Sequence, residues 1–166
     1  GEDAKKKVFE IIPQNAEVMN MSSVTIDSLG IAKEINESGK YDSVKNKLAK
    51  MDITTQGLEM KRIGAVMGYA VGSVQAVTED GKAIIASNTG SQLPAYAYGA
   101  YHVIWVVGTQ KIVANLDEAM KRIYDYVLPL ESDRLRKVYG VSSNVSKLLI
   151  INKERIPSRL TLILVK

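Results

Sequence analysis

The segment "YHVIWVV", from Tyr101 to Val107, is apolar at nearly every position. A strand with one face in water would alternate apolar and polar residues, whereas this segment presents apolar side chains on both faces. Such a strand is typical of a parallel sheet that is covered on both sides. We therefore expect it to lie in the middle of a central sheet, and the rest of the chain must supply the helices that cover it.

The rest of the chain alternates between helical and extended patterns. Apolar spacing predicts helices over residues 2–12, 26–38, 41–51, 54–67 and 92–98, and a long helix from 116 that bends near 129 and reaches 137. Further strands are expected over residues 16–21, 147–152 and 160–165. The Asp80-Gly81 pair lies between two β-prone runs, 70–78 and 82–87, which predicts an antiparallel hairpin.

This order of elements predicts the α/β class, as a three-layer αβα sandwich with a mostly parallel mixed sheet. At 166 residues the chain has the usual size of one domain, and we assign residues 1–166 to a single domain. Because Gly1 lies next to a predicted helix, we expect the native N-terminus to be truncated. No apolar run approaches the roughly 20 residues that a membrane helix needs, so we expect a cytoplasmic protein without a membrane partner.

Composition excludes several kinds of chemistry. The chain has no Cys, which removes disulfides, thiolate nucleophiles and Cys-ligated iron–sulfur or zinc sites, and it has one His. We therefore predict no metal site and no evident cofactor. The net charge of +4 is dispersed along the chain rather than gathered in a basic stripe, so nucleic acid is not expected as a partner. A small anionic ligand is compatible with this charge.

Polar turns follow the predicted strands at three places. In open α/β sheets, ligands bind beyond the carboxyl ends of the parallel strands. Hydroxyls, free backbone amides and an ammonium are groups that bind an anion. The candidate ligand-binding residues are Ser22, Ser23, Thr25, Asn88, Thr89, Gly90, Ser91 and Lys111. Each also has a plainer interpretation: a helix cap for the first turn, a tight connection at Gly90 and a solvated lysine at 111.

Three segments together carry a resemblance to a known family. They are "VMNMSSVT", "VGSVQAVTEDGKAIIASNTGSQLPAYAYGAYHVIWVVGTQKIV" and "KLLIINKE". With them the whole chain resembles the LUD domain family, the lactate-utilization group that includes LutC and YkgG. The resemblance implies the fold of the NagB/RpiA/CoA transferase-like superfamily and a role in oxidation of L-lactate. It also implies iron–sulfur subunits of a lactate oxidation complex as partners, with this chain as a non-redox subunit or an anionic-ligand-binding module.

The superfamily resemblance separates anion binding from catalysis. Gly72-Ser73-Val74-Gln75 takes the place of the acidic segment of ribose-phosphate isomerases, and Asn88 to Ser91 and Lys111 take those of their glycine turn and lysine. The groups that hold an anion are kept, whereas the carboxylates that would move protons are not. Isomerase chemistry is therefore not expected. The ligand could be a phosphate, a carboxylate or a CoA-like molecule.

A second function stays open at this point. CoA transferases use a glutamate nucleophile in a short "ENG" turn, which Glu79-Asp80-Gly81 resembles. A glutamate that attacks a thioester also needs backbone amides to stabilise the oxyanion, and nearby glycine turns could supply them. The alternative is thus an acyl-CoA transferase or thioesterase-like enzyme with Glu79 as its catalytic residue.

Overall fold

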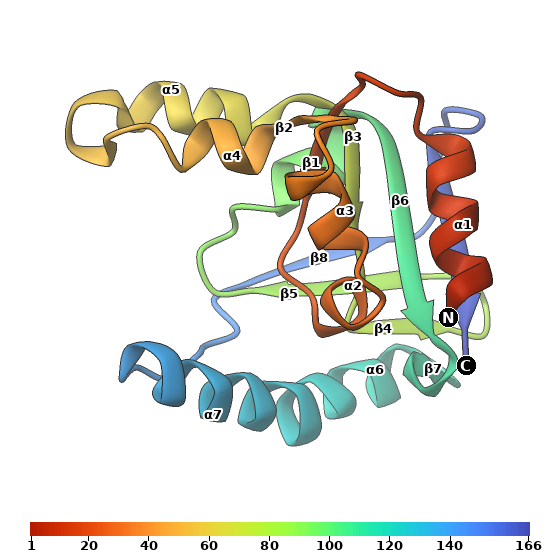
Figure 1. Ribbon diagram of the computed structural model, residues 1–166. Coiled ribbons are helices and arrows are strands. Elements are labelled where there is room, and N and C mark those ends of the chain that lie inside the picture. Colours follow the sequence, from red (N-terminus) through yellow and green to blue (C-terminus); the bar gives the residue numbers. More distant parts are fainter.

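The computed structural model describes all 166 residues and contains two sheets with helices around them (Figure 1). The first sheet has five parallel strands in the order β2-β1-β3-β6-β9. They are β1 (Glu17–Asn20), β2 (Asp42–Ser43), β3 (Met67–Gly72), β6 (Ala100–Gly108) and β9 (Leu160–Val165). The apolar segment of the sequence forms β6, which pairs with β3 on one side and β9 on the other. Its predicted interior position is confirmed.

The second sheet has four strands in the order β7-β4-β5-β8. They are β4 (Ala76–Thr78), β5 (Ala83–Ser87), β7 (Ile112–Val113) and β8 (Lys147–Ile151). The predicted hairpin is confirmed as the antiparallel pair β4 and β5, and Gly81 has the positive φ of 92° that favours glycine in such a turn. Strand β8 extends the pair on the outer side of β5.

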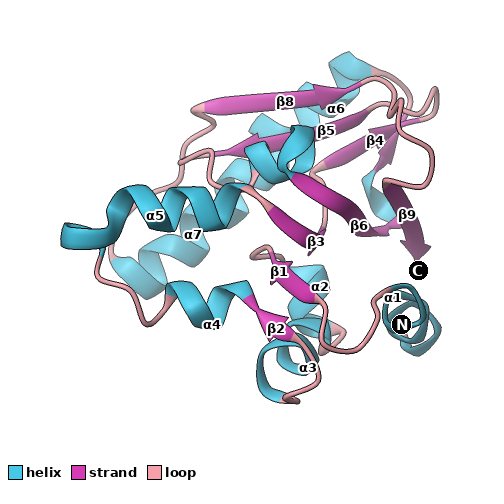
Figure 2. Ribbon diagram, turned by 90° about the horizontal axis from the view of Figure 1, so that it is seen from above, coloured by secondary structure: helices cyan, strands magenta, loops and turns pink.

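Helices pack on one face of the parallel sheet and on the outer side of the second sheet (Figure 2). One buried cluster joins the sheet residues Val18, Val71 and Ile104 to helices α1 (Glu2–Ile11), α2 (Val24–Ser28) and α3 (Ile31–Glu37). On the second sheet, Ala76 and Ile84 pack against α6 (Leu116–Arg122) and η3 (Ile123–Val127). The remaining helical segments are α4 (Val44–Leu48), α5 (Ile53–Ala65), η1 (Ala95–Gly99), η2 (Thr109–Lys111) and α7 (Leu128–Tyr139).

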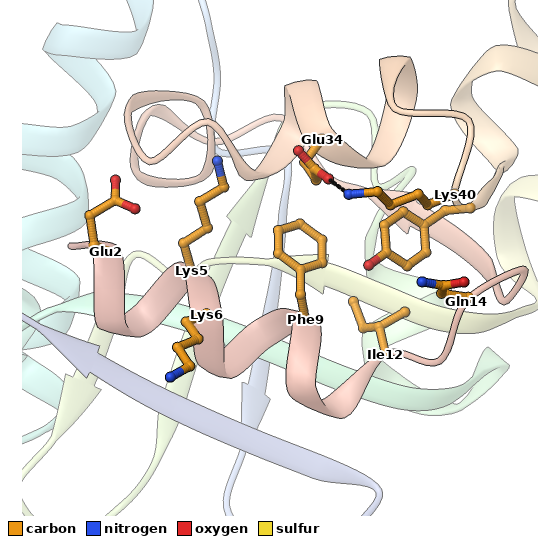
Figure 3. A pocket seen from close by; sticks show the side chains of 9 residues that line it. Glu2, Lys5, Lys6, Phe9, Ile12, Gln14, Glu34 and Lys40 are labelled. Carbon is orange, nitrogen blue, oxygen red and sulfur yellow. Dashed lines mark hydrogen bonds and ion pairs between the residues drawn. The ribbon is translucent and has the colours of Figure 1, made fainter.

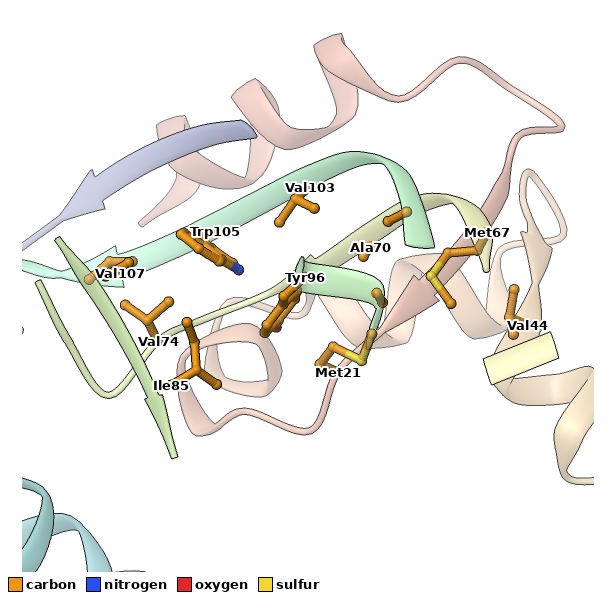
Figure 4. Packing of buried hydrophobic residues seen from close by; sticks show 13 residues of the cluster. Met21, Val44, Met67, Ala70, Val74, Ile85, Tyr96, Val103, Trp105 and Val107 are labelled. Atoms are coloured by element: carbon orange, nitrogen blue, oxygen red, sulfur yellow. The ribbon is translucent and has the colours of Figure 1, made fainter. Parts of the chain in front are cut away.

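The largest buried cluster lies between the two sheets (Figure 4). Trp105 on β6 is 1% exposed, and Tyr96 of η1 meets it edge-on with ring centroids 5.4 Å apart. The hydroxyl of Tyr96 lies against Gly72, where a Cβ atom would overlap it. Glycine at position 72 therefore lets η1 pack closely over the carboxyl end of β3.

The α/β class is confirmed, with a parallel sheet flanked by helices. The division into two sheets was not foreseen, because the run 70–78 was interpreted as one strand. It is two: β3 ends at Gly72 in the first sheet and β4 begins at Ala76 in the second. The helix expected over 54–67 is also too long, since Met67 is already the first residue of β3.

Smaller differences concern the first half of the chain. The helix predicted over 26–38 is broken into α2 and α3 by Gly30, whose φ is 66°. The helix predicted over 41–51 begins with the short strand β2. The long helix is capped by Asn115, whose Oδ1 accepts a hydrogen bond from the backbone amide of Glu118 at 3.0 Å. No helix is long and apolar enough to cross a membrane.

Candidate functional site

The carboxyl ends of β1, β3 and β6 bring three polar side chains together. Lys111, in η2 after β6, donates from Nζ to Ser73 Oγ at 2.8 Å and to the carbonyl oxygen of Val74 at 3.1 Å. A third, longer contact of 3.5 Å joins the same Nζ to Thr25 Oγ1 on α2, which follows β1. Parallel strands place their carboxyl ends at one edge of a sheet, so residues distant in sequence meet here.

The electrostatics around Lys111 are unusual for a lysine. Partial burial, together with the positive charge of Arg122, lowers its pKa from 10.5 to about 8. No carboxylate lies within 4 Å of its Nζ, and its three partners are neutral oxygens. A half-buried ammonium without an anionic partner is costly for the fold, and an anion bound beside it would reduce that cost.

Arg122 is the second cation of this region and was not among the residues expected from the sequence. It lies at the end of α6, where its Nε donates to the carbonyl oxygen of Gln75 at 3.1 Å and its guanidinium lies 4.9 Å from the ring centre of Tyr126. It forms no ion pair with a carboxylate. Since the carbonyls of Val74 and Gln75 are consecutive, one short segment after β3 holds both cations.

Asn20 adds an uncharged polar group at the carboxyl end of β1. Its side chain is fully buried, and neither Oδ1 nor Nδ2 has a hydrogen-bond partner. Met19 and Met21 belong to the cluster between the sheets, and Val18 to the cluster under α1, α2 and α3. Because side chains alternate along a strand, Asn20 points to the same side as α2, which carries Thr25.

In the first predicted turn, from Ser22 to Thr25, neither serine hydroxyl caps the helix that follows. Ser23 is the N-cap residue of α2, but its side chain makes no capping hydrogen bond. Ser22 is exposed, Ser23 is half-buried, and neither hydroxyl has a hydrogen-bond partner in the protein. The plain capping interpretation of these two serines therefore has no support in the geometry, and of the three residues predicted in this turn only Thr25 contacts Lys111.

The second predicted turn makes its contacts elsewhere. Asn88 accepts a hydrogen bond from the hydroxyl of Ser146 at 3.0 Å, and the amide of Gly90 donates to Ser87 Oγ at 2.8 Å. The hydroxyls of Thr89 and Ser91 pair with each other at 3.2 Å. Gly90 has a φ of 88°, and the side chain of Lys147, the first residue of β8, lies directly against it.

The structure thus arranges the predicted residues in two groups. Thr25 and Lys111 meet at the carboxyl edge of the parallel sheet, whereas the turn from Asn88 to Ser91 packs on the start of β8 in the second sheet. No hydrogen bond joins the turn to Lys111. Instead, Ser73 contacts Lys111, the charge of Arg122 acts on it, and Asn20 lies at the carboxyl end of the neighbouring strand β1.

Glu79 lies at the tip of the β4–β5 hairpin. Its backbone amide donates to the carbonyl oxygen of Val113 at 2.9 Å, while its carboxylate is exposed and has no hydrogen-bond partner or ion pair. The neighbouring Asp80 is bound by Thr78 and by Lys82, and these contacts lower its pKa. The role of Glu79 as a nucleophile stays a prediction from the sequence.

Two open cavities of about 390 Å³ each lie away from this cluster. One is formed by α1, α3 and the segments that precede β1 and β2 (Figure 3). In its lining Lys40 Nζ binds Glu34 at 2.8 Å, whereas the side chains of Lys5 and Lys6 form no hydrogen bond or ion pair. The other lies at the amino ends of β3 and β6, beside Tyr98 and the half-buried His102, whose ring stacks on Tyr69. The second cavity therefore lies at the amino edge of the parallel sheet, and neither cavity is lined by Lys111 or Arg122.

Comparison with known proteins identifies the family. The fold defines an α/β protein whose polar cluster lies at the carboxyl edge of a parallel sheet. The sequence model of the LUD domain matches residues 1–165, and the chain therefore belongs to the LUD domain family. No curated protein sequence matches the chain.

Solved structures agree with this assignment at the level of the fold. A DUF162 family protein from Deinococcus radiodurans superposes with a TM-score of 0.59 at 12% identity, covering 100% of this chain and 84% of that protein. A ribose 5-phosphate isomerase from Plasmodium falciparum reaches a TM-score of 0.41 at 14% identity, covering 68% of this chain and 52% of the isomerase. The second similarity is too low to support an inference about function.

Proposed function

We propose that this LUD domain protein binds a small anionic metabolite through Lys111 and Arg122, as a non-redox module in the use of lactate or a related organic acid. Membership of the family associates the chain with lactate utilization at the level of the family. The observation that carries the proposal is the pair of cations at the carboxyl edge, neither of which has a carboxylate partner. A bound carboxylate or phosphate would give both cations an anionic partner.

The chemistry of the cluster favours binding over turnover. Ser73 and Thr25 add hydroxyls that can donate to an anion once it has displaced their contacts with the ammonium. The hydroxyls of Ser22 and Ser23, which the protein leaves unpaired, lie just before α2, the helix that carries Thr25. No carboxylate contacts the cluster, so a general base of the usual kind is missing from it.

Calorimetric titration with L-lactate, pyruvate, inorganic phosphate and coenzyme A tests the proposal. We expect at least one of them to bind, and we expect Lys111→Met or Arg122→Gln to weaken its binding roughly tenfold to a hundredfold, as loss of one charged hydrogen bond does. Lys61→Met and Lys121→Gln remove exposed charges and serve as matched controls. If all four variants bind as the unmodified protein does, the anion site lies elsewhere.

The proposed partner is an iron–sulfur subunit, as the resemblance to the lactate-utilization group implies. A chain without thiolates needs another subunit to carry electrons through an iron–sulfur cluster, so the proposal includes an iron–sulfur subunit as partner. Affinity purification of the tagged protein from its native host, followed by measurement of bound iron, tests this point. Recovery of the protein without any iron-containing subunit would separate the ligand-binding role from lactate oxidation.

A further inference from the structure

The amine of Lys111 has the surroundings that make a lysine nucleophilic. An ordinary lysine is protonated at neutral pH, and its ammonium has no lone pair with which to attack a carbonyl. With a pKa of about 8, roughly one Lys111 in ten is neutral at pH 7, against fewer than about one in a thousand for a lysine with a pKa of 10.5. Desolvation and a neighbouring cation are the two means by which proteins activate such amines, and both are present here.

The hydrogen bonds of Lys111 suit both protonation states. The hydroxyl of Ser73, 2.8 Å from Nζ, accepts from the ammonium and can donate to the neutral amine after rotating. The carbonyl of Val74 at 3.1 Å accepts from either form. An ion pair with a carboxylate would hold the amine protonated, and no such pair is formed. Neutral groups alone therefore position the side chain, and the lone pair of the neutral amine is available when the Ser73 hydroxyl accepts from the amine rather than donating to it.

We propose that Lys111 condenses reversibly with the carbonyl carbon of a 2-oxo acid, whose carboxylate is bound by Arg122. The inference rests on the proposed anion site and specifies its ligand class. A 2-oxo acid carries its carbonyl next to its carboxylate, and the protein holds an amine and a guanidinium on the consecutive carbonyls of Val74 and Gln75, near enough for the charge of Arg122 to lower the pKa of Lys111. The planar guanidinium binds a carboxylate through two parallel hydrogen bonds.

The condensation needs no oxidant and no further reactant. Nζ forms a bond to the carbonyl carbon, and the electron pair of the C=O bond moves to oxygen, which takes a proton to give a carbinolamine. The carbinolamine then loses that oxygen as water. The two hydrogens of this water correspond to the two that the neutral amine loses. The imine nitrogen finally takes up one proton from solvent. The hydroxyls of Ser73 and Thr25 lie where they can relay these protons.

Reductive trapping tests the inference. The purified protein is incubated with pyruvate and sodium cyanoborohydride at pH 7, and the modified lysines are located by peptide mass mapping. We expect Lys111 to be labelled at least roughly tenfold faster than the exposed lysines, because its neutral fraction is far larger. Arg122→Gln should slow labelling by pyruvate more than labelling by its uncharged methyl ester. Labelling spread evenly over the lysines would overturn the inference.

Lys111→Arg separates this inference from the proposed anion site. The variant keeps a cation at position 111 but has no amine that can form an imine, so it should bind phosphate and give no adduct at that position. If the unmodified protein binds phosphate through Lys111 but shows no adduct there, the covalent step is wrong and the anion site stands. If Lys111→Met changes neither phosphate binding nor labelling, both proposals are wrong.

Discussion

The two edges of the parallel sheet differ in whether a carboxylate neutralises their cations. At the amino edge, the side chain of Arg159 is 4% exposed and donates to the carbonyls of Ala95, Tyr96 and Ala100, and to the carboxylate of Glu154 at 2.5 Å. At the carboxyl edge, Lys111 and Arg122 have neutral partners only.

This difference separates a structural cation from a candidate binding group. The protein itself satisfies nearly all the hydrogen-bonding groups of Arg159, which joins β6, η1 and the loop before β9. Its charge is paired with Glu154 and does not need an anionic ligand. Lys111 is half-buried without an anionic partner for its charge. Selection for stability alone would not retain a lysine at such a position. Substitutions at either edge test this difference.

The largest effect is expected at the amino edge. Arg159→Met leaves three carbonyls without their donor and Glu154 without its counter-ion, and it should lower the free energy of unfolding by about 3 kcal/mol. Urea unfolding measures this loss. Arg155→Met, an exposed change in the same loop, should cost less than about 0.5 kcal/mol. Equal stabilities of the two variants would show that Arg159 is not a structural cation.

The second effect concerns Gly72, which shapes the carboxyl end of β3. Gly72→Ala places a methyl group where the hydroxyl of Tyr96 lies, and we expect a loss of about 2 kcal/mol from overpacking. Tyr96→Phe removes that hydroxyl, so the double variant should recover part of the loss. Additive losses in the double variant, measured by the same urea unfolding, would show that the overlap is not the cause.

The third effect is a pH dependence of stability. The pKa of Lys111 is about 8 in the folded protein and near 10.5 in the unfolded chain. Between these values the unfolded chain binds more protons, so the free energy of unfolding should rise with pH, by roughly 1–2 kcal/mol after allowance for residual solvent exposure. Lys111→Met should flatten the rise, whereas Lys61→Met should keep it. A flat profile in the unmodified protein would mean that Lys111 is not desolvated.

The smallest effect is expected at Asn20. Its buried amide has no partner to lose, so Asn20→Leu should change the free energy of unfolding by less than about 1 kcal/mol. Thermal unfolding of the unmodified protein and of Asn20→Leu, each with and without the ligand found by calorimetry, measures this change. A loss above about 2 kcal/mol without ligand would show that the amide has a structural partner after all.

The sequence predicted best those features that depend on local pattern. The apolar run from Tyr101 to Val107 and the Asp80-Gly81 turn each carry their own chemical signal, and both are found as predicted. The break between β3 and β4 has no such signal, because a continuous β-prone run does not reveal where it changes from one sheet to another.

The candidate site was only partly accessible from the sequence, for a related reason. Lys111 and Thr25 could be placed because they follow strands whose carboxyl ends share an edge. Arg122 lies on a helix beside Lys121, and its sequence neighbourhood does not distinguish one cation from the other; only the packing of α6 on the second sheet brings Arg122 to Gln75. The turn from Asn88 to Ser91 has the composition of an anion site but follows a strand of the second sheet.

The central claim is that Lys111 is an uncompensated cation that binds an anion. Calorimetric titration with L-lactate, whose charge is constant between pH 7 and 9.5 and which has no carbonyl to condense, tests it most directly. The affinity of the unmodified protein should fall roughly tenfold or more between these pH values as Lys111 loses its proton, whereas Lys111→Arg should bind equally at both. An affinity that is independent of pH in the unmodified protein and unchanged in Lys111→Met would contradict the claim.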